Sequence, residues 1–246
     1  MTDFLIHTRE RQMKCFFKIS ALAALLVSVS SGAVTLDYRH EYKPESGTNA
    51  DRLKIGHTTQ DGYFASVEGR ISEKTEVDNE GYKNGIEKYS GNGSEIEFGK
   101  NFIINDQLTL APAINLDLGD TYIGYRAQIK AIYKFNDNWM TSLRWRPGID
   151  VSENEGVKDK NYNQFNWELG YAYQDFSIVG DLEYRFTNYE DYEGEHNYWL
   201  YNVVASYSID KHWKPYTEIG YVPRYNQDHE KDEMEVRYRL GVKYTF

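Results

Sequence analysis

Hydrophobic and polar residues alternate along nearly the whole chain. In the last twelve residues, "EVRYRLGVKYTF", one set is apolar from Val236 to Phe246, and the interleaved set carries Arg237, Arg239 and Lys243. A period of two is typical of a β-strand, because successive side chains point to opposite faces of the sheet. The pattern therefore predicts an all-β protein whose strands each have one apolar and one polar face.

The alternation can be followed through about twelve strands, and no helical stretch is left to cover their apolar faces. One of them keeps its alternation over 123–135, which is longer than the roughly five or six residues of a usual strand. The apolar positions place the strands around residues 36–42, 53–55, 65–71, 96–98, 108–116, 123–135, 139–145, 165–173, 178–186, 199–209, 215–219 and 236–246.

The predicted connections alternate in length, with a single exception at 119–121. Short turns are expected at 61–62, 105–106, 136–138, 174–175 and 210–212. Longer polar loops are expected at 43–50, 74–92, 150–162, 188–195 and 223–234. Short turns at one end and long loops at the other are typical of outer-membrane barrels. We therefore predict a 12-stranded antiparallel transmembrane β-barrel of the bacterial outer membrane, with lipid covering the apolar faces and no strand edge left unpaired.

Aromatic residues gather at the predicted strand ends, where barrels carry aromatic girdles at the lipid–water boundary. The alternative is a soluble β-sandwich that holds these rings in its core. The residues concerned are Tyr42, Phe135, Trp139, Phe176, Trp213 and Phe246.

An export signal is predicted at the start of the chain. Lys14 and Lys18 flank the beginning of an apolar run that extends to Val29, and Ser31-Gly32-Ala33 supplies small residues for cleavage. We expect translation to start at Met13 and processing to occur after Ala33. Residues 1–33 are then an upstream extension plus signal peptide, and residues 34–246 form a single β-barrel domain. A longer positively charged region that includes residues 1–12 remains the alternative.

Composition excludes several classes of function. The chain has 28 basic and 38 acidic residues, and its single cysteine, Cys15, lies in the predicted signal. Processing after Ala33 removes four basic and two acidic residues, which leaves a net charge of −12 and no cysteine. A chain without cysteine has no disulfide, thiol nucleophile or cysteine metal site. The acidic balance argues against nucleic acid as a partner.

Basic residues nevertheless concentrate on the polar faces of the strands, while the acidic excess lies largely in the long loops. A guanidinium pairs bidentately with a carboxylate, so a series of them along a pore wall would give an anion successive weak binding sites. The alternative is that these cations pair with lumenal carboxylates and only fill the interior. The predicted pore-lining, substrate-binding residues are Arg39, Arg52, Lys54, Arg70, Arg126, Lys130, Arg144, Arg146, Arg185, Arg237, Arg239 and Lys243.

Six segments resemble the oligogalacturonate-specific porins, the KdgM family. They are "VTLDYRHEY", "DRLKIGH", "ASVEGR", "LRWRP", "HWKPYTEIGY" and "VRYRLGVKYTF", and they run in the same order from one end of the predicted mature chain to the other. The resemblance implies a monomeric twelve-stranded channel for the passive diffusion of acidic oligosaccharides. By motif it carries pore roles over to Arg39, Arg144, Arg146, Arg237 and Arg239.

The same resemblance implies oligogalacturonates as the solute. We also expect no cofactor, and contacts of the outer wall with outer-membrane lipid and lipopolysaccharide. The terminal Phe246 is expected to engage the barrel assembly machinery. Another acidic sugar such as sialic acid, a barrel hydrolase, or a structural barrel without transport remain alternatives. No enzyme is predicted, because the histidines lack metal-ligand spacing and no nucleophile–base arrangement stands out.

Overall fold

A computed structural model describes residues 32–73, 89–154, 156–190, 195–225 and 231–246. The predicted signal up to residue 31 and residues 74–88 of one predicted loop lie outside the described residues. In the part of the chain that is described, no helix is long and apolar enough to cross a membrane. The described strands are β1 (Gly32–Lys43), β2 (Thr48–Thr59), β3 (Tyr63–Glu73), β4 (Tyr89–Lys100), β5 (Phe102–Ile103), β6 (Leu108–Leu118), β7 (Tyr122–Lys134), β8 (Trp139–Ser152), β9 (Lys160–Tyr173), β10 (Phe176–Thr187), β11 (Asn197–Tyr207), β12 (Trp213–Tyr225) and β13 (Lys231–Thr245).

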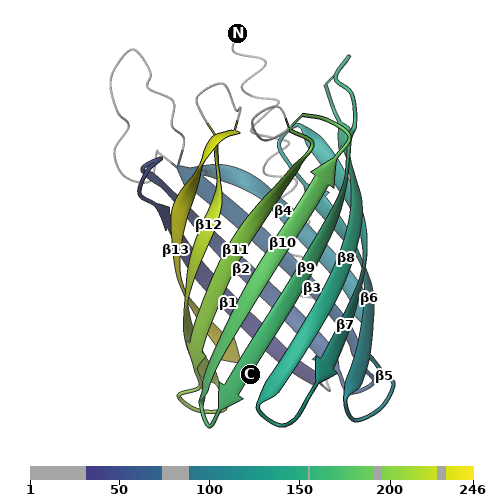
Figure 1. Ribbon diagram of the computed structural model, residues 1–246, viewed down its shortest axis with the longest axis vertical. Coiled ribbons are helices and arrows are strands. Elements are labelled where there is room, and N and C mark those ends of the chain that lie inside the picture. Colours follow the sequence, from purple (N-terminus) through teal and green to yellow (C-terminus); the bar gives the residue numbers. More distant parts are fainter. Residues whose placement is uncertain (1–31, 74–88, 155, 191–194, 226–230) are drawn as a thin grey trace.

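The strands close into a barrel (Figure 1). Each long strand pairs antiparallel with its neighbour along the chain, β1 pairs with β13, and β4 pairs directly with β6. The two-residue β5 adds only a short extension beside β6 and was not predicted. The twelve long strands confirm the predicted 12-stranded antiparallel barrel, and a single closed sheet replaces the two layers of the sandwich alternative.

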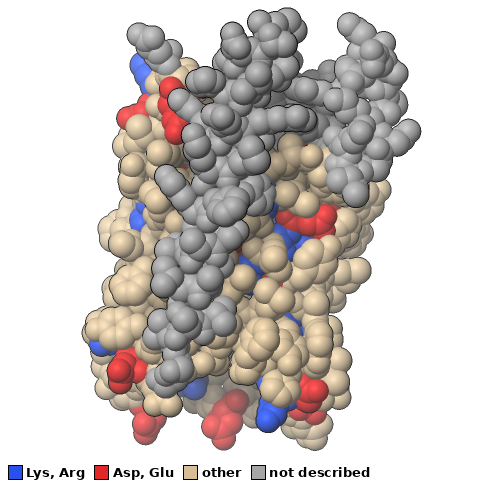
Figure 2. Space-filling model, turned by 180° about the vertical axis from the view of Figure 1, so that it is seen from behind, with Lys and Arg blue, Asp and Glu red and all other residues tan. Residues whose placement is uncertain are grey.

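The register of the strands separates an apolar outer wall from a polar inner wall. Leu240 and Ile114 lie on the outer wall and are 65% and 63% exposed, whereas Asn166 and Ser142 lie on the inner wall and are 2% exposed. Figure 2 shows a mostly uncharged outer surface, with several charged side chains at the lower end. Buried polar and exposed apolar side chains reverse the arrangement of a soluble core, as a lipid-facing barrel requires.

Three of the short turns at the lower end are capped by an Asn or Asp side chain (Figure 1). The side-chain oxygen of Asn136 accepts hydrogen bonds from the backbone amides of Asn138 and Trp139, at 2.9 Å each. Asn105 and Asp210 cap the turns at 105–108 and 210–213 in the same way. The amides of Trp213 and His212 hold the pKa of Asp210 below its ordinary value, because they stabilise the charged carboxylate. These contacts explain the short turns that the Asn and Asp residues predict.

The strands run further toward the loop end than the apolar pattern predicts. β1 continues to Lys43 and β2 starts at Thr48, so the predicted long loop over 43–50 is wrong. Likewise, β8 and β9 leave only 153–159 between them, and β12 and β13 only 226–230. Pairs such as Asp150 with Lys160 continue the ladder with polar side chains, since backbone hydrogen bonds do not require apolar residues.

Outward-facing aromatic rings form a girdle at the turn end. Trp139 lies 4.8 Å from Tyr171 and Trp213 lies 4.7 Å from Tyr244, measured between ring centroids. Tyr244 also contacts Phe246 edge to face. These contacts agree with the aromatic belt expected at a membrane boundary.

Glycines on the inner wall make room for aromatic rings from the neighbouring strand. Tyr216 of β12 faces Gly241 of β13, and a Cβ atom on Gly241 would lie 2.2 Å from the Tyr216 ring. Tyr162 and Phe64 lie against Gly148 and Gly99 in the same way. In each pair the ring covers the flat glycine backbone, which lets a large side chain lie along the wall instead of blocking the lumen.

Candidate functional site

All twelve predicted pore cations occupy inner-wall positions in the register. Arg39 faces Arg52 across β1 and β2, Arg52 faces Arg70 across β2 and β3, and Lys130 faces Arg144 across β7 and β8. Opposed like charges are unfavourable unless carboxylates or water separate them. The arrangement therefore depends on what each cation contacts.

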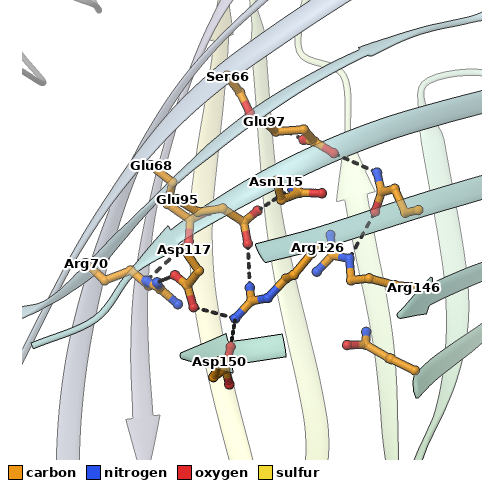
Figure 3. A network of polar contacts seen from close by, with 12 residues as sticks. Ser66, Glu68, Arg70, Glu95, Glu97, Asn115, Asp117, Arg126, Arg146 and Asp150 are labelled. Carbon is orange, nitrogen blue, oxygen red and sulfur yellow. Dashed lines mark hydrogen bonds and ion pairs between the residues drawn. The ribbon is translucent and has the colours of Figure 1, made fainter. Parts of the chain in front are cut away.

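One network joins five neighbouring strands from β3 to β8 (Figure 3). Arg70 and Arg126 both bind the carboxylate of Asp117, which also accepts a hydrogen bond from the Tyr122 hydroxyl at 3.0 Å. Arg126 also binds Glu95 at 2.8 Å, and an Asp150 carboxylate oxygen lies 3.9 Å from the Arg126 guanidinium. Figure 3 shows Arg70 and Arg126 approaching Asp117 from two sides. This network links the five strands, and its three carboxylates outnumber its two guanidiniums, so neither arginine is left without a negative partner.

A second network lies across β12, β13 and β1. Arg239 binds Glu41 at 2.7 Å and Glu218 at 2.6 Å, and Arg237 binds the same Glu218 oxygen at 3.0 Å. Next to it, Arg52 binds Asp37 at 2.7 Å. Two guanidiniums here share the Glu218 carboxylate, and Glu41 supplies the second negative charge.

The remaining paired cations have one close carboxylate each. Lys54 lies 3.4 Å from Glu97, Lys130 lies 2.7 Å from Glu168, and Arg185 lies 3.3 Å from Glu183.

Four predicted cations have no carboxylate oxygen within 4.0 Å among the described residues: Arg39, Arg144, Arg146 and Lys243. Two of them are held by amides instead. Arg144 donates to the Asn166 side-chain oxygen at 2.8 Å, and Arg146 donates to the Gln128 side-chain oxygen at 3.0 Å. A neutral acceptor orients a guanidinium without cancelling its charge, so these groups can attract an anion from the lumen.

Arg39 and Arg144 line the same lumenal cavity from opposite walls. In the ring of twelve long strands, β1 and β8 are six strands apart in either direction. The cavity has a volume of about 400 Å³, and its lining includes both arginines together with Arg237 and Arg239. A solute there would meet guanidiniums on both sides.

A second cavity of about 400 Å³ lies toward the turn end. Lys54, Lys130 and Arg144 line it together with Glu97 and Gln128. Because Arg144 borders both cavities, they adjoin at this side chain.

Some inner-wall residues were not among the predicted pore cations. Lys214 faces Lys243 across β12 and β13, and Lys43 lies 3.8 Å from Glu235. Extending the strict alternation to the strand ends would have included both lysines. The amide partners Asn166 and Gln128 could be placed inside by the same alternation, but their pairing with particular arginines could not, because it depends on the neighbouring strand. Among the described residues, no group of three or more His, Cys, Asp or Glu side chains could hold a metal ion.

A closed barrel with an apolar outer wall and a charged lumen defines a porin of the bacterial outer membrane. Residues 27–246 match the family described as "Oligogalacturonate-specific porin protein (KdgM)". The chain therefore belongs to the KdgM porin family, whose members are channels and not enzymes. The predicted family and outer-membrane location are confirmed, and the hydrolase alternative is wrong.

The comparisons extend over most of the chain. It is 31% identical over 244 residues to the oligogalacturonate-specific porin KdgM of Dickeya dadantii (strain 3937), which covers 93% of this chain and 99% of that relative. A solved structure described as "KdgM porin in complex with disordered oligogalacturonate" matches with a TM-score of 0.62 and 24% identity, over 86% of this chain and 99% of that chain. A NanC porin structure matches with a TM-score of 0.72 and 19% identity, over 86% of this chain and all of the other chain. These structures support the fold.

Proposed function

We propose that this protein lets anionic oligosaccharides, oligogalacturonates foremost, diffuse passively through the outer membrane along its arginine-lined lumen. The observation that carries the proposal is the pair of arginines on opposite walls of one cavity, Arg39 and Arg144, neither of which has a carboxylate partner among the described residues. The oligogalacturonate named for the relative from Dickeya dadantii supports this choice of solute.

The two sets of lumenal cations have different roles in this proposal. Cations that bind carboxylates, such as Arg126, stabilise the wall. This is the role that the alternative of a charge-paired, filled interior gives to all of them. Arg39, Arg144, Arg146 and Lys243 keep their charge for the solute. Several moderate sites in a row suit conduction, because a single tight site would trap the anion.

The test is the ion selectivity of the purified full chain in planar bilayers, measured as the reversal potential in a KCl gradient. The wild type is expected to prefer chloride. The double variant Arg39→Gln, Arg144→Gln is expected to lose most of this preference, because a unit charge about 4 Å from a passing anion contributes about 1 kcal/mol even in water.

The matched control is Lys158→Gln with Lys211→Gln, which removes the same charge from an exposed loop and an exposed turn. Equal reversal potentials for the wild type and both double variants would contradict the proposal. Swelling of protein-containing liposomes would then rank the solutes. Oligogalacturonates should enter faster than neutral oligosaccharides of equal length, and faster entry of sialic acid would favour the alternative substrate.

The proposal includes the remaining partners and the processing of the chain. One chain closes its own barrel, so we propose that it acts as a monomer surrounded by outer-membrane lipid and lipopolysaccharide, assembled through Phe246. Cleavage after Ala33 would remove two residues of β1, since this strand begins at Gly32. N-terminal sequencing of the protein from outer membranes tests this site, and a first residue other than Val34 would overturn it.

A further inference from the structure

Two aliphatic side chains line the cavity that Arg39 and Arg144 border from opposite walls. Leu200 and Val204 of β11 border the same space of about 400 Å³ as Arg39 and Arg144. The other side chains that border this space are charged or are amides, from Asn166 to Arg239. Both aliphatic side chains lie on the inner wall, because Leu200 faces Glu183 and Val204 faces Glu218 in the register. Lipid therefore does not account for their apolar character.

The position of β11 relative to the two arginines is symmetric. It lies three strands from β8, which carries Arg144, and three strands from β1, which carries Arg39. Between the two aliphatic residues along the strand lies Asn202, whose amide accepts a hydrogen bond from Arg237 at 2.7 Å and donates one to Asp181 at 3.3 Å. Asn202 is thus held by the wall, whereas Leu200 and Val204 present hydrocarbon to the lumen.

Apolar groups in a water-filled pore are unusual, since barrel interiors are polar. Binding sites for small molecules, however, commonly combine an apolar surface with a few polar groups that fix orientation. A uronate ring has matching surfaces: its carboxylate lies on the rim, and C–H groups cover its faces. Compact anions without such a face, citrate among them, can use only the arginines.

We propose that Leu200 and Val204 form an apolar platform for a ring face of an oligohexuronate whose carboxylates contact Arg39 and Arg144. The platform makes the lumen selective for acidic sugars over other anions of equal charge. This inference rests on the proposed function and adds to it the residues that recognise the sugar ring.

The experiment measures how trigalacturonate and citrate block the chloride current of the full chain in planar bilayers. The variants are Leu200→Asn and Val204→Thr, alone and together. The matched control is Val203→Thr, which adds the same hydroxyl to the same strand but on the outer wall, where Val203 is 50% exposed. In the double variant the half-blocking concentration of trigalacturonate should rise about threefold to tenfold relative to that of citrate, because apolar contact area is lost. The control should keep the wild-type ratio.

The outcomes separate this inference from the proposed function. If the wild type is blocked by trigalacturonate and the double variant keeps the wild-type ratio, the platform is wrong and the anion channel stands. If the wild type shows no anion preference, both proposals are wrong. Leu200→Ala and Val204→Ala provide a second pair in case the polar variants do not fold. They remove contact area without adding a polar group, and an unchanged ratio in folded alanine variants would equally overturn the platform.

Discussion

Asp117 shows how a single residue organises the inner wall. Its side chain is 1% exposed and accepts from Arg70, Arg126 and Tyr122, which come from β3 and β7 on either side of its own strand β6. This one carboxylate is a shared ion-pair partner of two guanidiniums. Without it, Arg126 would keep Glu95, whereas Arg70 would keep, among the described residues, only Glu68 at 3.8 Å.

We expect Asp117→Ala to lower the free energy of unfolding by about 2 to 3 kcal/mol, because it leaves the partly buried Arg70 guanidinium poorly compensated. Urea unfolding of the full chain in lipid vesicles measures this. Asp106→Ala, in an exposed turn, serves as the control and should stay within about 0.5 kcal/mol of the wild type. Equal losses in the two variants would mean that the network adds no stability.

At the scale of the strand pair, Gly241 and Tyr216 depend on each other. The Tyr216 hydroxyl donates to Asp37 at 2.8 Å, and the ring reaches this position only because Gly241 has no side chain. The pair therefore couples β12 and β13 to the carboxylate that also binds Arg52 on β2.

Gly241→Ala is expected to destabilise the barrel by about 1 to 3 kcal/mol, because the new methyl group displaces the Tyr216 ring and breaks its hydrogen bond to Asp37. Gly180→Ala is the matched control, since a Cβ atom there meets nothing within 4 Å. Urea unfolding midpoints in vesicles compare the two variants. A shift for Gly180→Ala as large as that for Gly241→Ala would contradict this explanation.

The strands and their orientation were predictable because the membrane imposes them. Alternation placed Arg144 inside and Leu143 outside from the sequence alone, and Leu143 is 58% exposed. The strand ends at Lys43 and Lys160 were not predictable. Toward the loop end both faces of the strands are polar, so apolar and polar residues no longer alternate there. The sequence also could not show that Arg39 has no carboxylate oxygen within 4.0 Å among the described residues, because this depends on which carboxylates the register brings near it from other strands.

At the scale of the whole molecule, closure of the barrel places strands that are distant in sequence on opposite sides of the lumen. β1 and β8 are far apart in sequence, and their arginines border one cavity only because the ring closes through β1 with β13 and β4 with β6. The proposed anion selectivity is thus a property of the closed ring. A resemblance of single motifs could suggest the pore residues, but it could not show which of them face each other.

Asn166 connects a cation and an anion on the inner wall of the barrel. Its side-chain oxygen accepts a hydrogen bond from Arg144, and its side-chain nitrogen donates one to Asp181 at 2.9 Å. Among the described residues, Asp181 has amide partners only. When the medium is acidified below about pH 4, an aspartate takes up a proton, whereas an arginine and an amide do not change. The lumen would then become more positive, so chloride preference should be stronger at about pH 3 than at pH 7, and a reversal potential that stays constant would contradict this. Acid surroundings would make this porin more attractive to those solutes that still carry their charge.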